Sequence, residues 1–201
     1  MEFEKFTGVK SLGYTYGSTR AGFADCTNLK SVKLPQSLTS VGVSCFASSG
    51  VESVNLDNVT GLYNQSFHNS QIKEVYAPNL TTIQTNVFLN CTNLVKVTSL
   101  GKITSIPAGG ASWGFFGGCT SLTFVDLPDT LTDIGGNAFR ACSSVQTLIL
   151  RASTPPILGS GNGAFANANI YVPDANVIAY KEATGWINFA DKIRGVSTLG
   201  I

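Results

Sequence analysis

The sequence predicts a repeat solenoid, mainly β, from its composition, a recurring phenylalanine and a template shared between the phenylalanines. The chain has 201 residues, of which 43% are hydrophobic and 12% are charged. This composition supplies one sizeable core and excludes a disordered polar chain. Phenylalanine returns every 21 to 28 residues, at positions 23, 46, 67, 88, 116, 139 and 165. A period of this length is typical of stacked repeats.

The residues between the phenylalanines follow a common pattern. The two best-formed units begin at Phe23 and Phe116 and share the template F-x-x-C-x-x-L-x-x-V-x-L-P-x-x-L-x-x-I-G, with valine for isoleucine in the first. The other units fit with small edits; for example, Ser49 and Ser70 replace the cysteine. Insertions lengthen two units, and such insertions map to loops on one side of a coil.

The V-x-L part of the template alternates with period two, which predicts a short strand whose hydrophobic residues point inward. Stacked units place such strands in parallel about 4.8 Å apart, so each unit needs only its neighbours for burial. Proline after the strand ends the ladder and turns the chain. The expected inward pairs are Val32 with Leu34, Val54 with Leu56, Val75 with Ala77, Val125 with Leu127, and Leu148 with Leu150.

A second inward pair follows on another face of the coil, and the glycine after it permits a tight corner. The phenylalanines are expected to stack as an aromatic spine along the core. The second pairs are Leu38 with Val41, Leu80 with Ile83, Ile103 with Ile106, and Leu131 with Ile134.

The repeats and their ends predict one domain over residues 1–201. Residues 1–22 are expected to form an N-terminal half-unit that caps the coil, and residues 23–168 about six repeats. Residues 169–201 are expected to form the C-terminal cap, because a solenoid must protect its terminal hydrophobic faces with atypical units.

Within the expected C-terminal cap, Pro173 and Asp174 indicate the start of a helix. Trp186, Phe189 and Ile193 follow this helix and are expected to close the last coil.

The template, with its Cys-x-x-Leu and Leu-Pro signature, resembles the BspA-like leucine-rich repeats of bacterial surface antigens. The closing segment 170–186 resembles the usual ending of such chains. The resemblance covers nearly the whole sequence and is specific for fold, whereas such repeats encode a coil and not a chemistry. It implies a right-handed leucine-rich-repeat coil with short parallel strands, an irregular convex side and a short C-terminal helical cap.

The same resemblance implies an extracellular or cell-surface bacterial protein with a role in host adhesion. The first five residues lack a basic segment followed by an apolar one, and no apolar run approaches the roughly 18 residues needed to cross a bilayer. We therefore expect no signal peptide here and no direct membrane insertion. A net charge of +1 provides no field that would collect nucleic acid or anionic lipid. We expect a monomer.

The five cysteines are an odd number, and no Cys-x-x-Cys pair occurs, so a disulfide framework is not expected. Cys26, Cys91, Cys119 and Cys142 share one template position. Free cysteine is among the most buried residue types, so these four are expected to form a buried column beside the phenylalanines. Cys45 lies outside the column and is expected to be the most exposed thiol.

Few residue patterns in the sequence indicate catalysis. The sole histidine, His68, excludes a multi-histidine metal site, and no Gly-x-Ser-x-Gly elbow provides a nucleophile. Solenoid enzymes that act on polysaccharides need several carboxylates on one exposed ladder. Among the outward residues at equivalent strand positions in neighbouring units, Glu74 stands between Ser53 and Lys96. Asp126 stands between Thr98 and Ile149. We expect no cofactor and no metal, and a polysaccharide-acting enzyme is the least favoured alternative.

Two glycine-rich stretches, at 109–110 and 159–163, lack the order of a phosphate-binding loop and are interpreted as flexible inserted loops. The first lies beside Trp113, Phe115 and Phe116, so it is a candidate local binding edge.

The outward residues of the main strands form two columns whose members are mostly small, polar or charged. Large apolar groups with a polar surround are typical of interaction sites, and four such residues stand in these columns. An equal alternative is that the inserted loop or the C-terminal segment folds over them. The candidate partner-binding residues are Phe124, Ile149, Tyr171 and Tyr76, together with Asp126 and Lys33.

The leading hypothesis is a non-catalytic binding module that presents its strand face to a protein or glycan partner, such as host extracellular matrix or mucosal material. The alternative is a structural spacer within a larger surface assembly.

Overall fold

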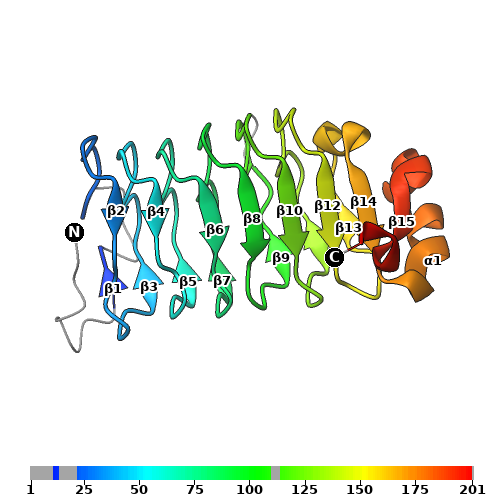
Figure 1. Cartoon of the computed structure of the whole chain (residues 1–201), viewed down its shortest axis with the longest axis horizontal. Coiled ribbons are helices and arrows are strands. Elements are labelled where there is room, and N and C mark those ends of the chain that lie inside the picture. The colour runs from blue at the N-terminus through cyan, green and yellow to red at the C-terminus, as the bar shows by residue number, and fades with distance from the viewer. Residues whose placement is uncertain (1–10, 14–21, 110–113, 201) are drawn as a thin grey trace.

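The computed structural model describes residues 11–13, 22–109 and 114–200. Successive coils of the chain stack along one axis into an elongated solenoid, with the first coils at one end and a helical cap at the other (Figure 1). The predicted repeat solenoid is confirmed.

One long side of the solenoid, which we call the strand face, carries the main strand of each coil, and every pairing on it is parallel. A two-stranded sheet, β2-β4, is followed by a six-stranded sheet in the order β15-β14-β12-β10-β8-β6. The strands are β2 (Ser31–Val32), β4 (Ser53–Val54), β6 (Glu74–Tyr76), β8 (Lys96–Ser99), β10 (Phe124–Leu127), β12 (Thr147–Leu150), β14 (Asn169–Val172) and β15 (Ile193–Gly195).

The opposite side, expected to be irregular, carries shorter parallel ladders in sheets of four and three strands, in the orders β1-β3-β5-β7 and β13-β11-β9. Threonines beside these strands add bonds between coils: the hydroxyl of Thr60 donates to the carbonyl of Thr39 at 3.1 Å, and that of Thr81 to Thr60 at 3.2 Å. The strands are β1 (Ser11–Leu12), β3 (Ser40–Val41), β5 (Gly61–Leu62), β7 (Thr82–Ile83), β9 (Ser105–Ile106), β11 (Asp133–Ile134) and β13 (Ile157–Leu158).

The aromatic spine is confirmed. Ring centroids of successive phenylalanines from Phe23 to Phe165 lie 5.0 to 5.6 Å apart, and Trp186 continues the stack 6.1 Å beyond Phe165. Every spine ring after the first is fully buried. The expected inward pairs are buried too, except that Val54 and Ile83 are only half-buried.

The cysteine column is confirmed at three of its four positions. The thiols of Cys91, Cys119 and Cys142 are buried, and each donates to the carbonyl of the spine phenylalanine one coil earlier, at 3.0, 3.1 and 3.0 Å. The column therefore satisfies backbone acceptors inside the core.

The expectations for the other two thiols were wrong. Cys26 is exposed. Cys45 is fully buried. Gly22 lies so close to it that a Cβ there would be 2.7 Å from the Cys45 sulfur, and burial raises the pKa of Cys45 to about 12.

The predicted short C-terminal helix is confirmed as α1 (Val177–Glu182). The 3-10 turns η2 (Asp174–Asn176), η3 (Trp186–Lys192) and η4 (Val196–Leu199) surround it in the expected cap, and a further 3-10 turn, η1 (Gly163–Asn167), lies just before the cap. Two buried side chains fasten it to the last full coil. The hydroxyl of Tyr180 donates to the carbonyl of Ala152 at 2.8 Å, and the indole N–H of Trp186 to that of Pro156 at 2.7 Å. Ile193 begins β15, so the cap also extends the strand face by one strand.

The expected N-terminal half-unit, 1–22, lies outside the described residues except for 11–13 and Gly22. Residues 11–12 form β1, which pairs with β3 in parallel. Division of the chain into one domain with two caps therefore stays a prediction.

The glycine-rich stretch at 159–163 is anchored, contrary to the expectation of a flexible loop. Its Asn162 is buried; the side-chain oxygen accepts the N–H of Phe139 at 3.0 Å, and the amide donates to the carbonyls of Gly135 and Gly159 at 3.1 and 2.9 Å. One side chain thus ties two coils together.

The binding edge expected beside the glycine-rich stretch at 109–110 is not formed by its phenylalanines. Phe115 and Phe116 are fully buried in the core, where their rings meet edge to face. Gly110 and Trp113 lie outside the described residues.

Candidate binding surface

The six candidate partner-binding residues lie in different environments. Tyr76 is 54% exposed and Lys33 is exposed, whereas Phe124, Asp126 and Tyr171 are half-buried. The sixth, Ile149, is only 1% exposed. Of the two equal alternatives for the apolar residues of this face, exposure or coverage by the protein itself, coverage applies to Ile149.

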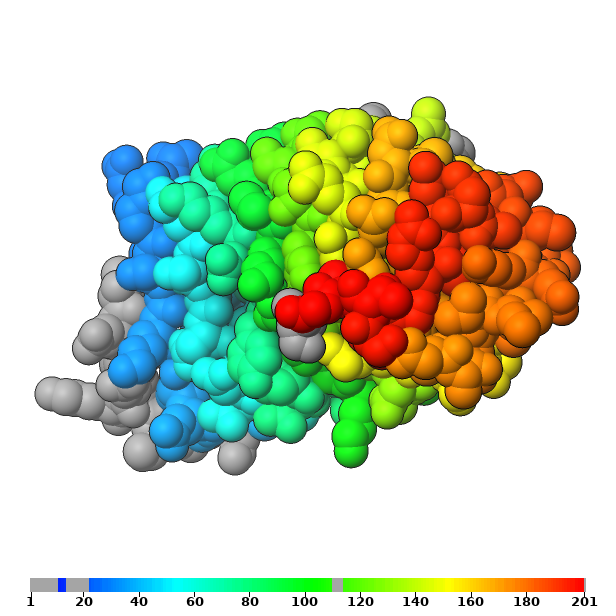
Figure 2. Space-filling view, turned by 45° about the vertical axis from the view of Figure 1, so that its right-hand side comes forward, coloured from blue at the N-terminus to red at the C-terminus, as the bar shows by residue number. Residues whose placement is uncertain are grey.

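The end of the chain accounts for the loss of surface at the C-terminal part of the strand face. Turn η4 packs against β14 and β15, and Figure 2 shows this end of the chain (red) lying over the last coils. A hydrogen bond of 2.6 Å from the hydroxyl of Ser197 to the Asp174 carboxylate holds η4 to the cap. The alternative in which the C-terminal segment folds over part of the face therefore applies here, while β4 and β6 remain open.

In the middle of the strand face, Phe124 is engaged by a neighbour. It lies opposite Lys96 in the β8–β10 register, and the Lys96 ammonium lies 5.2 Å from the centroid of the Phe124 ring. This cation–π contact covers part of the ring with the protein's own side chain.

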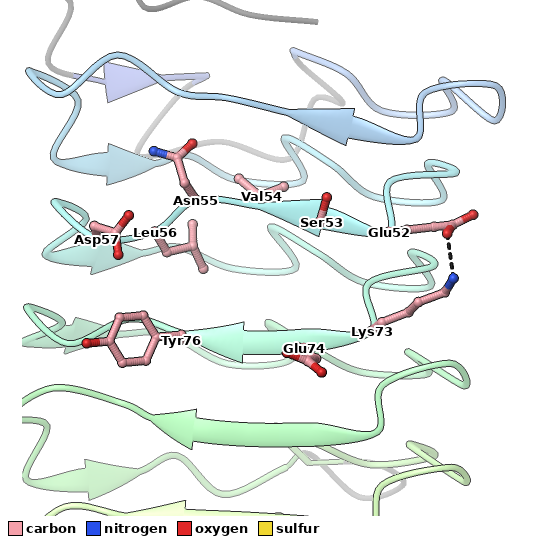
Figure 3. A pocket seen from close by; sticks show the side chains of 9 residues that line it. All are labelled: Glu52, Ser53, Val54, Asn55, Leu56, Asp57, Lys73, Glu74 and Tyr76. Carbon is pink, nitrogen blue, oxygen red and sulfur yellow. Dashed lines mark hydrogen bonds and ion pairs between the residues drawn. The ribbon is translucent and has the colours of Figure 1, made fainter.

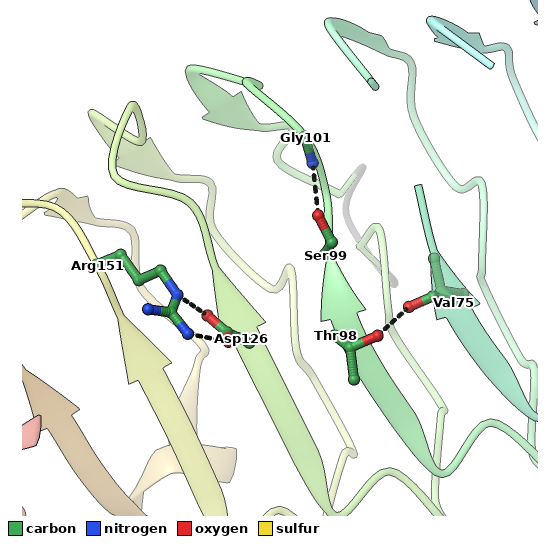
Figure 4. Close-up of polar contacts among 6 residues, drawn as sticks. All are labelled: Val75, Thr98, Ser99, Gly101, Asp126 and Arg151. Carbon is green, nitrogen blue, oxygen red and sulfur yellow. Dashed lines mark hydrogen bonds and ion pairs between the residues drawn. The ribbon is translucent and has the colours of Figure 1, made fainter. Parts of the chain in front are cut away.

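Asp126 is also engaged. Arg151 donates from Nε to one carboxylate oxygen and from a terminal nitrogen to the other, both at 2.7 Å (Figure 4). This bidentate pair raises the pKa of Arg151. Sequence reasoning missed Arg151, although a signal was present: it stands where the template has proline, so a long cation replaces the residue that ends the strand in other coils.

A β-bulge shifts the register between β6 and β8. Val75 pairs with Val97, but Tyr76 pairs with Ser99, so Thr98 is the extra residue. Thr98 therefore does not lie opposite Tyr76, where an unbroken register would place it. Instead its hydroxyl donates to the Val75 carbonyl at 3.4 Å (Figure 4). Bulges locally disrupt pairing and bend the strand.

On its other side, β8 pairs with β10 over two residues only, Lys96 and Val97, which come before the bulge in the chain. A polar hollow of about 190 Å³ lies at this point. Its lining includes Thr98, Ser99, Asp126, Asp129 and Arg151.

A larger hollow of about 430 Å³, which we call the β4–β6 groove, lies between the second and third main strands (Figure 3). The two strands belong to separate sheets. The groove is lined by Glu52, Ser53, Val54, Asn55, Leu56, Asp57, Lys73, Glu74 and Tyr76.

Asn55, which lines the groove, bonds to the coil before it. Its side-chain oxygen accepts the N–H of Leu34 at 2.6 Å, and its amide nitrogen lies 3.4 Å from the Leu34 carbonyl. The amide thus bonds to the backbone of the preceding coil, on the side of β2, away from β6 (Figure 3). Its polar groups are therefore satisfied within the protein and do not point across the groove.

Polar contacts close both ends of the groove. At one end the Lys73 ammonium binds the Glu52 carboxylate at 2.6 Å, and Lys30 binds the same carboxylate at 3.1 Å. The hydrogen bond from Lys73 is the main reason that the pKa of Glu52 is lowered, and Lys30 adds to the effect. At the other end the Asn79 amide donates to the Asp57 carbonyl at 2.7 Å.

Two further carboxylates of the groove form no ion pair within the described part of the chain. Asp57 and Glu74 are exposed, and no ion pair found within residues 22–109 and 114–200 includes either of them. Lys96 is the register neighbour of Glu74, but it turns to Phe124 instead.

The described part of the chain holds no group of three or more histidine, cysteine, aspartate or glutamate side chains placed to bind a metal. In the same residues, no helix has the length and apolar character needed to span a membrane.

The solved structures that resemble this chain include two bacterial leucine-rich proteins. A leucine-rich repeat protein from Bacteroides ovatus is 14% identical, with a TM-score of 0.42 over 85% of this chain and 65% of its own. A leucine-rich cell surface protein from Faecalibacterium prausnitzii is 19% identical, with a TM-score of 0.39 over 76% and 56%. The chain thus spans less than two thirds of either.

Curated proteins show no match to this chain. A family model described as the BspA type leucine-rich repeat region matches in six copies, over residues 19–109 and 112–175. These ranges contain most of the coils described above, and the chain belongs to the BspA-type leucine-rich repeat family.

Proposed function

We propose that this chain is a non-catalytic binding module of a bacterial cell-surface or secreted protein, and that the open part of its strand face binds a protein or glycan of a host. The family supports a repeat-based binding or scaffold module of bacterial surface proteins. The observation that carries the proposal is the β4–β6 groove with Tyr76 at its edge.

The groove has the features of a recognition site. Its volume of about 430 Å³ falls in the range of roughly 300–1,000 Å³ that is usual for ligand sites, which combine apolar lining with a few polar groups. Tyr76 is 54% exposed on an otherwise polar face, and tyrosine is enriched among the residues that dominate binding energy.

Two of the carboxylates that line the hollows, Glu52 and Asp126, are engaged by cations of the protein itself. Lysines hold Glu52 and lower its pKa, whereas a general acid needs a raised one. Asp126 is held by both donors of Arg151. Neither side chain is therefore available for proton transfer.

A structural spacer in a surface assembly is the second candidate. It is favoured by the burial of Ile149 and by the internal contacts of Phe124 and Asp126, which reduce the accessible apolar surface of the strand face.

The test is binding of the purified chain to immobilised extracellular-matrix proteins and to mucosal glycans. We expect capture by the wild type and weaker capture by Tyr76→Ala. Ile178→Ala is the matched control, because Ile178 is 70% exposed on α1 in the cap. Absence of wild-type binding, or equal binding by Tyr76→Ala and the wild type, would overturn the proposed function in favour of the spacer.

A further inference from the structure

Building on the proposed function, we infer that the partner is a protein and that the β4–β6 groove binds an arginine-containing segment of it. The guanidinium would lie against the ring of Tyr76 and face the carboxylates of Asp57 and Glu74.

The first argument is charge. The groove is lined by three carboxylates, Glu52, Asp57 and Glu74, and by one ammonium, Lys73. Two lysines, Lys73 and Lys30, bind the single carboxylate of Glu52. With Asp57 and Glu74 added, the formal net charge of these five side chains is −1, and its negative end lies at the two carboxylates that no lysine binds. Charged groups across an interface are arranged with complementary potentials, so this groove selects a cation.

The second argument is the aromatic ring. Tyr76 rises from β6 on the same strand as Glu74, and Asp57 lies across the groove at the same end (Figure 3). A planar guanidinium can stack on a ring while its edge donates to a carboxylate, which an ammonium cannot do. Lys96 over Phe124 shows that this face already holds a cation on a ring, at 5.2 Å.

The third argument is the shape of the groove. Val54 and Leu56 supply apolar lining between the charged groups, and the aliphatic part of a long basic side chain packs on such surface while its charge stays at the rim. A neutral sugar would cover Asp57 and Glu74 without supplying a countercharge, and this costs free energy. The geometry therefore favours a basic peptide over a neutral glycan.

The experiment titrates the folded chain with a fluorescently labelled, acetylated glycine peptide that carries two arginines. Matched peptides carry lysine or the neutral isostere citrulline. We expect the arginine peptide to bind more tightly than the lysine peptide, and the citrulline peptide to bind least. Raising the salt concentration from about 50 mM to about 300 mM weakens binding, because the pairs are exposed.

Variants then locate the site. Tyr76→Ala is expected to weaken arginine-peptide binding between about 2-fold and 30-fold, the range of a cation–π contact. Asp57→Asn and Glu74→Gln each weaken it as well. Glu182→Gln is the matched control, because it removes an exposed carboxylate of α1 outside the groove.

Equal binding of the arginine and citrulline peptides, or an effect of Glu182→Gln as large as that of Glu74→Gln, would overturn the inference. Loss of capture of neutral mucosal glycans by Tyr76→Ala, without binding of the arginine peptide, would show that the inference is wrong and leave the proposed function in place. If Tyr76→Ala changes no binding of any kind, both are wrong.

Discussion

Truncation of one ring of the aromatic spine tests how the coils hold each other. Phe67 is fully buried, and its ring centroid lies 5.1 Å from that of Phe46 and 5.5 Å from that of Phe88. Phe67→Ala leaves a cavity between two coils and removes both ring contacts. Because truncation of a buried phenylalanine costs about 3–5 kcal/mol, we expect the free energy of unfolding to fall by about that amount.

Phe23→Ala is the matched variant. Phe23 is half-buried, and its ring stacks on that of Phe46 at 5.4 Å. We expect a loss of roughly half as much or less, since the buried area of the side chain is smaller.

Urea denaturation followed by circular dichroism measures both variants. Each coil contacts only its neighbours, so loss of Phe67 in the middle of the stack is also expected to broaden the transition. If the two variants lose equal stability, or if Phe67→Ala loses less than about 1 kcal/mol, then the spine does not carry the stability between coils.

Three further predictions follow from buried polar groups and thiols. Asn162→Ala is expected to lower the free energy of unfolding by about 1–3 kcal/mol because it leaves buried backbone groups without partners. Asn188→Ala removes one exposed hydrogen bond and is expected to cost less than about 0.5 kcal/mol. Equal melting temperatures for the two variants would contradict this prediction. Burial raises the pKa of Cys45 and of Cys91 to about 12, so the folded state binds these protons more tightly than the unfolded state. The contribution of these thiols to stability should be constant below about pH 8.5, the pKa of a free thiol, and should fall by roughly 1.4 kcal/mol per pH unit for each thiol above that pH. Denaturation midpoints that do not change between about pH 8 and about pH 11 would refute the raised pKa values. A thiol reagent should label Cys26 alone in the native protein and all five cysteines in denaturant, and mass spectrometry that finds native Cys45 labelled as fast would contradict its burial.

Much of the core could be predicted from the sequence. In a solenoid each coil places the same template position in the same surroundings, so seven phenylalanines with one period report the stacked spine directly. The inward strand pairs follow from period two for the same reason. The same reasoning fails for Cys26 and Cys45. Cys26 occupies the template position but is exposed, and Cys45 lies outside that position but is buried.

The candidate site was predicted less well, because it depends on contacts between coils rather than on position within a coil. Tyr76 was identified as an apolar residue in an outward column, and it is exposed. The groove beside it was missed, since it lies between two coils whose main strands, β4 and β6, belong to separate sheets. Arg151 was missed because its partner, Asp126, is 25 residues away.

The sequence by itself therefore determined the coil, its period, its spine and the direction of the side chains, because these are repeated local properties. Tertiary structure alone decided which outward residues are accessible. Ile149 and Tyr76 are both outward residues of main strands, yet Ile149 is buried and Tyr76 is exposed. The C-terminal turn η4 packs against β14 and β15, whereas Tyr76 stands where the ladder opens between β4 and β6. Both effects depend on contacts between separate segments of the chain, which a repeat template cannot report.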